Sequence, residues 1–360
     1  MSGDLLSLRL QIDALDQQLL QILNSRARLA EKVGEVKRRD GTPFFRPDRI
    51  IQVIEKIKQS NHGPLRNEHV ASIWHEIMSS CLALEAPVRV AFLGPAGTFS
   101  EQAAIQYFGS SISHIACASI DEVFKAAASG SADYGVVPVE NSTEGVVSRS
   151  LDLLLNSPLH IIGETSLQVQ HNLLRLTDSM ADIEAVYAHP QALAQCQDWL
   201  TAHLPHATRH AASSNSEGAR LAAGNPSWAG VASTRAGALH GLHIVAHGIQ
   251  DDAFNRTRFA VVCLPKVLSP PAASGKDCTS LVVSVTNRPG AVHDILMPLK
   301  DHGVSMTRFE SRPARSGQWE YYFYIDLQGH PSQPHVQAAL GELQKLCAFY
   351  KVLGSYPVSD

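Results

Sequence analysis

The 360-residue chain lacks the features that define several classes of protein. Its six cysteines include no C-x-x-C pair, and its 17 histidines form no H-E-x-x-H motif or Cys/His ligand cluster, so we expect free thiols in a reducing cytosol and neither a metal nor another cofactor. No window approaches the ~20 consecutive apolar residues of a membrane span, and no signal peptide is evident at the amino end. The net charge of -4 gives no global reason to expect nucleic acid. The chain is therefore expected to be cytoplasmic, with no nucleic-acid or membrane partner.

The composition is that of an ordinary globular protein. Hydrophobic residues make up 44% and charged residues 18% of the chain. This length predicts two or three domains. The pattern of apolar residues changes twice along the chain, which predicts an all-α domain at 1–86, an α/β domain at 87–266, a linker at 267–277 and an α+β domain at 278–360.

The first segment has the apolar spacing of helices. From Asp4 to Arg38 apolar residues recur every three or four positions, without Pro and without Gly before Gly34. A helix of ~35 residues would be about 50 Å long, too long for this segment to cover alone, so we expect a second copy of the chain to cover part of it. Breaks at residues 41–43 and 61–64 separate two further amphipathic helices.

Two cations interrupt the apolar stripe of the first helix. Arg26 and Lys37 fall where the spacing demands apolar side chains, and a buried cation is costly unless an anion pairs with it. Glu85 lies on the apolar face of the third helix, four residues after Cys81. Arg9 precedes Arg26 by 17 positions and points about 100° away, so the two are not expected to serve one site within one chain. The alternative is structural: Lys37 extends to solvent at the helix end and Arg26 pairs with a carboxylate.

The pattern L-R-x-x-I-D-x-L-D-x-x-L-L, followed by R-A-x-L-A, resembles the all-helical chorismate mutase family. The resemblance implies an intertwined homodimer with two shared sites, in which Arg9 serves the partner's site. It implies that chorismate rearranges to prephenate without a nucleophile, through positioning and charge stabilisation at the breaking ether bond. The implied catalytic residues are Arg9, Arg26, Lys37, Arg49 and Glu85, and the implied substrate-binding residues are Arg46, Ile50 and Cys81.

After Pro87 short apolar strands alternate with helical stretches, which predicts an α/β domain with a largely parallel sheet. Polar clusters follow several of the strands, where open α/β sheets bind ligands and helix N-termini face anions. Any single cluster is explained equally by ordinary helix capping. The clusters are Gly94–Ser100, Glu140–Gly145, His189–Gln191, Ser213–Asn215 and Ser233–Thr234.

Three motifs together resemble prephenate dehydratase: G-P-x-G-T-F-S, V-P-V-E-N-S-T-E-G and the N-R-T-R-F run at 255–259. The resemblance implies two lobes like those of a periplasmic binding protein, the second at about 168–244, with prephenate between them. It implies loss of CO2 and water to give phenylpyruvate, with Thr257 as the catalytic proton donor. The implied substrate-binding residues are Glu140, Asn141, Ser142, Thr143, His189, Gln191, Ser214, Asn215 and Arg256. For Glu140 two other roles stay open, in catalysis or in ordering the loop.

The last segment has the order strand, helix, strand, strand, helix, strand, which is the ferredoxin-like split motif. With N-R-P-G-A-V at 287–292 and E-S-R-P at 310–313 it resembles the ACT regulatory domain, which implies feedback inhibition by L-phenylalanine. We expect this domain, together with the mutase domain, to pair two copies of the chain in a homodimer. The alternative is a dimerisation module without a ligand. The implied allosteric residues are Asn287, Pro289, Gly290, Ala291, Val292, Glu310, Ser311, Arg312 and Pro313.

Two other functions fit parts of this pattern. A fusion of chorismate mutase with prephenate dehydrogenase would need a nucleotide-binding G-x-G-x-x-G after a strand, which the sequence lacks. A non-catalytic amino-acid sensor would need neither Thr257 nor the pair of cations on the first helix. The sequence therefore favours a bifunctional enzyme of phenylalanine biosynthesis.

Overall fold

The computed structural model describes residues 3–265, 273–314 and 321–358. Its contacts divide the chain into two compact units. The helical unit comprises Met1–Val88 and Phe108–Ser113, and the main unit comprises Arg89–Tyr107 and His114–Asp360. Residues 266–272, which include most of the predicted linker at 267–277, lie outside the described part of the chain.

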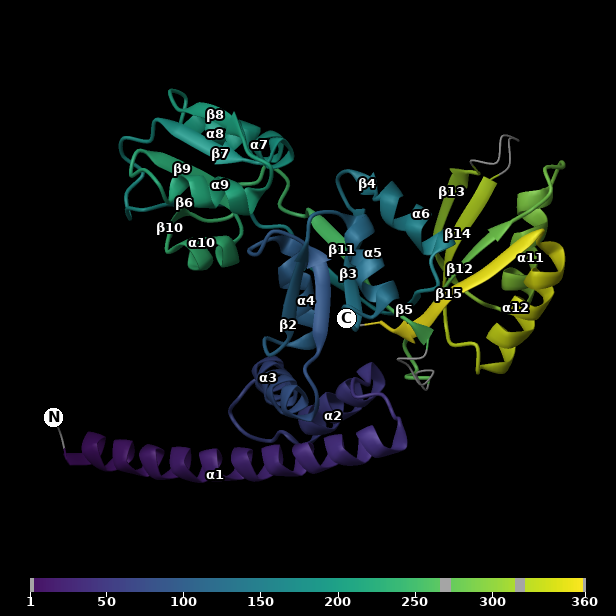
Figure 1. Ribbon diagram of the computed structural model, residues 1–360, viewed down its shortest axis with the longest axis horizontal. Coiled ribbons are helices and arrows are strands. Elements are labelled where there is room, and N and C mark those ends of the chain that lie inside the picture. The colour runs from purple at the N-terminus through teal and green to yellow at the C-terminus, as the bar shows by residue number, and fades with distance from the viewer. Residues whose placement is uncertain (1–2, 266–272, 315–320, 359–360) are drawn as a thin grey trace. The chain divides into compact units, whose positions relative to one another are not determined.

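The helical unit contains the three predicted helices, α1 (Gly3–Asp40), α2 (Pro47–Ser60) and α3 (Asn67–Glu85). The long helix α1 is seen at the amino end in Figure 1. It ends before Gly41, whose φ of +67° suits glycine and stops the helix. Gly34 lets α1 approach α3 closely, because a Cβ there would lie 2.8 Å from the Cα of Glu85.

Helix α1 leaves its apolar stripe uncovered within one chain. The stripe residues are between 41% and 66% exposed, although their spacing is that of a buried face. They are Leu5, Leu8, Ile12, Leu15, Leu19, Ile22, Leu29 and Val33.

The first lobe of the main unit is built on a sheet with the strand order β2-β1-β3-β11-β5, and the short β4 pairs with β3. Its strands are β1 (Arg89–Leu93), β2 (Ser113–Cys117), β3 (Tyr134–Asn141), β4 (Gly145–Val146), β5 (His160–Gln168) and β11 (Arg256–Cys263). Its helices are α4 (Phe99–Phe108), α5 (Ile120–Ser129) and α6 (Ser148–Asn156). The prediction of a largely parallel sheet is wrong, because β11 returns from the second lobe and inserts antiparallel to both β3 and β5.

The second lobe is a smaller mixed sheet with the order β10-β6-β9-β7-β8. Its strands are β6 (Asn172–Arg175), β7 (Ala185–Ala188), β8 (Thr208–Ala211), β9 (Trp228–Ala232) and β10 (His243–Ala246). Its helices are α7 (Pro190–Gln195), α8 (Gln197–His203), α9 (Asn215–Ala222) and α10 (Thr234–His240). Strand β7 is parallel to β8 and β9, whereas β6 is antiparallel to its neighbours β9 and β10.

The last domain has the predicted ferredoxin-like order, β12 (Asp277–Ser284), α11 (Ala291–Asp301), β13 (Met306–Pro313), β14 (Tyr321–Gln328), α12 (Pro334–Leu346) and β15 (Phe349–Pro357). The sheet is antiparallel with the order β13-β14-β12-β15, and α11 and α12 lie side by side on one of its faces (Figure 1). Leu281 and Val283 of β12 pack with these helices.

The opposite face of this last sheet shares a core with the first lobe. Val282, Tyr324 and Leu353 are buried in one cluster with Leu151 and Ile161. Gly354 permits this approach, because a Cβ there would collide with the carbonyl oxygen of Ile161. The last domain is thus continuous with the first lobe and not an independent module on a tether.

No helix in the described residues combines the length and apolarity needed to cross a membrane.

Candidate active sites

The helical unit brings two of the predicted mutase residues into contact. The ammonium of Lys37 lies 2.7 Å from Oε2 of Glu85 and also donates to the carbonyl of Phe44 over 2.9 Å. Arg38 donates to the carbonyl of Glu85 over 2.6 Å, which anchors the end of α3 against α1. The buried carboxylate of Glu85 is therefore held where α1 and α3 meet. The carboxylate partner of Lys37 comes from a distant helix, which the pattern on α1 alone could not reveal.

The other predicted mutase residues border this point or lie far from it. Arg26 is half-buried on α1, whereas Arg49 is exposed on α2, where Ile50 is half-buried. Arg9 precedes Arg26 by 17 residues on one straight helix, which is about 25 Å along the axis. Within one chain, Arg9 therefore cannot reach a ligand held by Arg26.

Arg46 and Cys81 are less suited to direct substrate contact than predicted. Arg46 donates to the buried carboxylate of Asp48, with 3.0 Å between Nε and Oδ1. The hydrogen bond from Arg46 lowers the pKa of Asp48, against the opposing effect of burial. The charge of Arg46 is thus already balanced, and Cys81 is 7% exposed in the core.

In the main unit a cavity of about 580 Å³ opens between the two lobes. It is lined by loops that follow strands of both sheets, as the sequence predicts. Six of the predicted dehydratase residues line it: Asn141, His189, Gln191, Ser214, Asn215 and Thr257.

Thr257 and Asn141 are paired residues on β11 and β3. Nδ2 of Asn141 donates to Oγ1 of Thr257 over 2.9 Å and to Oδ1 of Asn255 over 2.8 Å. Oδ1 of Asn141 accepts from the backbone N–H groups of Thr143 and Glu144, at 3.0 Å each. These two acceptances fix which end of the amide faces Thr257. The loop after β3 and the threonine hydroxyl are thereby held in one arrangement.

Several polar residues of the second lobe act as helix caps at the cavity. Ser214 accepts from the N–H of Glu217 at the start of α9, and Ser233 caps α10 in the same way. His189 caps α7 through Nδ1, and its own N–H donates to Oδ1 of Asn215 over 3.1 Å. Capping and ligand binding are compatible here, because these N-termini end at the cavity wall.

Four predicted binding residues stand outside the residues that line the cavity. Ser142 accepts from the N–H of Arg256 over 2.9 Å, and Thr143 donates to Asp252 over 3.3 Å, so both order the loop. The Arg256 side chain is exposed. Glu140 precedes Asn141 on the strand, so its side chain lies on the opposite face, where it pairs with Arg258.

The structure adds residues that the sequence did not single out. Asn255 is 1% exposed and receives the hydrogen bond from Asn141. His171 is 2% exposed at the cavity wall, with Nε2 placed 2.9 Å from Oε1 of Gln195. Burial lowers the pKa of His171, against the hydrogen bond with Gln195. Asn255 could have been found from its place in the N-R-T-R-F run, whereas no local signal marks His171 or Gln195.

The predicted allosteric residues lie at one end of the last sheet. Gly290 has φ of +81° and caps α11, with Asn287 and Pro289 exposed before it and Ala291 and Val292 in the first turn. The other motif, 310–313, ends β13 at the same sheet end, because Tyr322 pairs with both Ser284 and Arg312. Arg312, however, turns to α6 of the first lobe, where Nε donates to Asp152 over 3.2 Å. Glu310 is half-buried, and Ser311 and Pro313 are exposed.

No cluster of three or more His, Cys, Asp or Glu suited to a metal ion occurs in the described part of the chain. The chain thus combines a helical unit that holds a half-buried ion pair, a two-lobed fold with a hydroxyl held by an amide in its cleft, and a ferredoxin-like domain. These features define a fused enzyme of three parts.

Comparison with known proteins assigns each part. Residues 8–86 match the chorismate mutase type II family, residues 90–266 match prephenate dehydratase and residues 279–344 match the ACT domain. A bifunctional chorismate mutase/prephenate dehydratase of Neisseria gonorrhoeae is 47% identical over 352 residues, covering 97% of this chain and 95% of that protein. One of Stutzerimonas stutzeri is 44% identical, covering 99% and 98%. The chain belongs to the bifunctional chorismate mutase/prephenate dehydratase family and has both enzymatic activities.

Solved structures resemble the dehydratase and ACT portion. The crystal structure of prephenate dehydratase in complex with L-Phe from Arthrobacter aurescens has a TM-score of 0.67 and 33% identity, covering 74% of this chain and 89% of that one. A protein described as a quorum quenching acylase, GqqA, has a TM-score of 0.68 and 31% identity, covering 75% and 98%. The fold is therefore shared by proteins described with different activities, and the residues of the site must carry the functional argument. The assignment to this family replaces both the dehydrogenase fusion and the non-catalytic sensor considered from the sequence.

Proposed function

We propose that the cavity between the lobes binds prephenate and that Thr257 donates the proton that accompanies loss of the ring hydroxyl. The C–O bond to that hydroxyl breaks while the C–C bond to the ring carboxylate releases CO2, and the electron pair of that bond completes the aromatic ring. The departing hydroxide leaves as water with a proton from Thr257, which is replaced from solvent. A threonine hydroxyl is a weak acid, so its contribution is to transfer this proton within an aligned hydrogen bond.

The single observation that supports this assignment is the hydrogen bond from Asn141 to Thr257. Because the amide nitrogen donates to Oγ1, the threonine's own O–H is left to donate to another acceptor. Both N–H groups of the Asn141 amide are engaged by Thr257 and Asn255, so Asn255 and the helix N-termini behind Ser214 and His189 supply N–H groups for the two carboxylates of prephenate. Glu140, Ser142, Thr143 and Arg256 are assigned to ordering the loop, where their contacts place them.

In the helical unit we propose that chorismate binds to three cations, Arg26 and Lys37 of α1 and Arg49 of α2. Lys37 and Glu85 face the breaking ether bond, and Arg9 is contributed by a second copy of the chain. The uncovered apolar stripe of α1 and the ~25 Å between Arg9 and Arg26 support this arrangement. The proposed assembly is a homodimer paired through α1, in the cytoplasm.

For the last domain we propose that L-phenylalanine binds at the sheet end formed by 287–292 and 310–313 and inhibits the dehydratase. The positive φ of Gly290 opens the start of α11 to a carboxylate. Removing everything after about Lys276 is a poor test, because the last sheet shares a buried core with the first lobe. The full chain with Gly290→Val is preferable, because a β-branched residue at that φ closes the turn.

The test measures dehydratase activity and L-phenylalanine binding in the wild type and in Gly290→Val. The proposal expects the wild type to bind and to be inhibited, and expects the variant to lose both responses while it retains activity. Wild-type sensitivity in a folded Gly290→Val enzyme would place the regulatory site elsewhere.

A further inference from the structure

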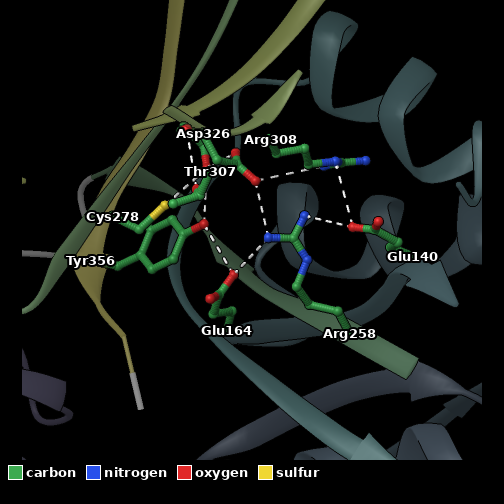
Figure 2. A network of polar contacts seen from close by, with 9 residues as sticks. Glu140, Glu164, Arg258, Cys278, Thr307, Arg308, Asp326 and Tyr356 are labelled. Atoms are coloured by element: carbon green, nitrogen blue, oxygen red, sulfur yellow. Dashed lines mark hydrogen bonds and ion pairs between the residues drawn. The ribbon is translucent and has the colours of Figure 1, made fainter. Parts of the chain in front are cut away.

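Arg258 lies directly after Thr257 on β11, and its side chain leaves the cavity wall on the opposite face. There its guanidinium meets carboxylates from both domains of the main unit, as Figure 2 shows. Glu140 of β3 lies 3.0 Å from Nη2, Glu164 of β5 lies 3.2 Å from Nη1, and Asp326 of β14 lies 3.0 Å from Nη1. One cation therefore joins the strand of Thr257, its two neighbouring strands and the regulatory sheet.

This group is named here the Arg258 cluster. It contains three carboxylates and two guanidinium groups, because Arg308 of β13 also approaches Glu140 at 3.6 Å and Asp326 at 3.8 Å. Nε of Arg258 and Nη2 of Arg308 are buried without a hydrogen-bond partner among the described residues. Burial raises the pKa of Glu164, with Arg258 opposing and Asp326 adding to the rise. Two guanidinium donors are thus unused beside three carboxylates, so the hydrogen bonds of the cluster can be redistributed.

Asp326 is held by the last domain itself. Its Oδ1 accepts from Ser280 over 2.6 Å, and Ser280 lies 2.8 Å from the hydroxyl of Tyr356. Asp326 is 5% exposed and sits on the middle of β14. A movement of this sheet relative to the first lobe must therefore move the carboxylate that Arg258 contacts.

The other end of the cluster adjoins the Asn141–Thr257 pair. Glu140 is opposite Arg258 in the β3–β11 register, and the next pair along is Asn141 with Thr257. The register shifts immediately after Arg258, so this stretch of the ladder is already irregular. If Arg258 moves toward Asp326 it loosens its contact with Glu140, and the adjacent Asn141–Thr257 hydrogen bond is displaced with it.

We propose that Arg258 is a positioning residue shared by the two domains, and that the Asp326–Arg258–Glu140 chain transmits phenylalanine binding from the last domain to Thr257. This inference rests on the proposed regulation by L-phenylalanine. In this proposal Arg258 has two arrangements, one held chiefly by Glu140 and the other held chiefly by Asp326. The phenylalanine site and the dehydratase site each shift the balance between these two arrangements. The arrangement held by Glu140 aligns Thr257, and the one held by Asp326 does not.

The domain contact does not depend on Asp326, which makes its substitution informative. Lys351 of β15 donates to the carbonyls of Leu154, Leu155 and Ser157 at 2.8–2.9 Å, and Tyr324 donates to the carbonyl of Leu151 over 2.9 Å. These bonds fix the last sheet to α6. Asp326→Asn keeps an acceptor for Ser280 and removes the negative charge together with the second oxygen, which accepts from Arg258.

The experiment measures dehydratase activity of the full chain with and without saturating L-phenylalanine, and measures L-phenylalanine binding by calorimetry. We expect Asp326→Asn to bind phenylalanine and to remain active without it, but to lose most of the inhibition at saturation. Asp326→Glu should recover part of the inhibition, because the charge is restored. Glu342→Gln removes an exposed carboxylate that pairs with His302 in the same domain, and should be inhibited like the wild type.

Arg258→Lys tests the positioning role directly. A lysine cannot reproduce the forked contacts with Glu140 and Asp326, so we expect a lower kcat for prephenate with little change in KM. A change confined to KM, or no change, would overturn that role.

Full inhibition of a folded Asp326→Asn enzyme would overturn the coupling while leaving the proposed regulation intact. A wild type that neither binds nor responds to phenylalanine would overturn the regulation and the coupling together. If Asp326→Asn does not fold, Asp326→Glu is compared with Glu342→Gln, and equal inhibition of these two at every phenylalanine concentration overturns the coupling.

Discussion

The amide nitrogen of Asn141 donates a hydrogen bond to the hydroxyl oxygen of Thr257 over 2.9 Å. The amide cannot turn over, because its oxygen is engaged by the N–H groups of Thr143 and Glu144. The Thr257 hydroxyl is therefore an acceptor toward Asn141, and its own O–H is left for another acceptor. The hydrogen bond from Asn141 thus keeps the O–H of Thr257 from pointing toward Asn141, whereas a free threonine hydroxyl could donate in either direction.

Asn141→Asp should reverse that direction. A carboxylate at this position can only accept, so it would draw the Thr257 proton away from the substrate, and its charge would oppose binding of a dianion. We expect kcat/KM for prephenate to fall by about 100-fold or more, in the range of a lost proton-transfer group. Asn141→Ala is the matched variant that loses the donor without adding charge, and it should be less impaired. Equal activity of Asn141→Asp and wild type would contradict the assigned direction.

Two inactive mutase variants should restore activity when mixed. Arg9→Ala and Arg26→Ala damage the same site from different chains, because the two residues are about 25 Å apart along α1. Random exchange of subunits makes half of the dimers mixed, and each mixed dimer holds one intact site, so about a quarter of wild-type mutase activity should return. Native mass spectrometry confirms the exchange. No recovery after confirmed exchange would place both residues in the site of one chain.

Glu85→Gln should raise mutase activity. The carboxylate of Glu85 pairs with Lys37 at 2.7 Å, and a negative charge there would repel an ether oxygen that gains negative charge, whereas an amide donates a hydrogen bond to it. We expect mutase kcat/KM of Glu85→Gln to exceed that of the wild type by about tenfold, the value of one hydrogen bond. Dehydratase activity of the same samples is the internal control. Equal or lower mutase activity of a folded Glu85→Gln enzyme would contradict the placement of Glu85 at the ether bond.

His171 should make the main unit less stable in acid. Burial lowers its pKa below the ordinary 6.5, so the unfolded chain takes up a proton at a pH where the folded chain does not. The resulting loss of folding stability is absent above about pH 6.5, and it grows as the pH falls toward the lowered pKa of His171. His171→Gln should therefore lose less thermal stability than the wild type between pH 7.5 and 5.5, measured by calorimetry. His206→Gln, at an exposed position, should behave like the wild type, and an equal acid loss in His171→Gln would contradict the prediction.

The order of the three folds could be predicted from the sequence because each depends on local spacing. The three helices, the βαββαβ order and the placement of polar loops after strands all follow from apolar periodicity and turn residues. The antiparallel insertion of β11 could not be predicted, because it depends on how the second lobe returns the chain to the first sheet. Sequence spacing contains no record of that path.

In the candidate dehydratase site, too, some residues could be predicted from the sequence, whereas their orientation and distant contacts could not. Thr257 and Asn141 are predicted from their motifs, and the same resemblance predicts Glu140 as a substrate-binding residue, because a motif does not show which face of β3 a side chain occupies. The strand continues to Asn141, and its alternation turns Glu140 toward Arg258. The contact between Arg258 and Asp326 spans 68 positions along the chain. Only the folded structure could show that this arginine faces the regulatory domain.

The most direct test of the account is a time course of chorismate, prephenate and phenylpyruvate with full-length wild type and Thr257→Ala. The wild type should consume chorismate, pass through prephenate and accumulate phenylpyruvate. Thr257→Ala should consume chorismate at the wild-type rate and stop at prephenate, because the helical unit is untouched and the proton donor is missing. Phenylpyruvate formed by Thr257→Ala at the wild-type rate would contradict the account.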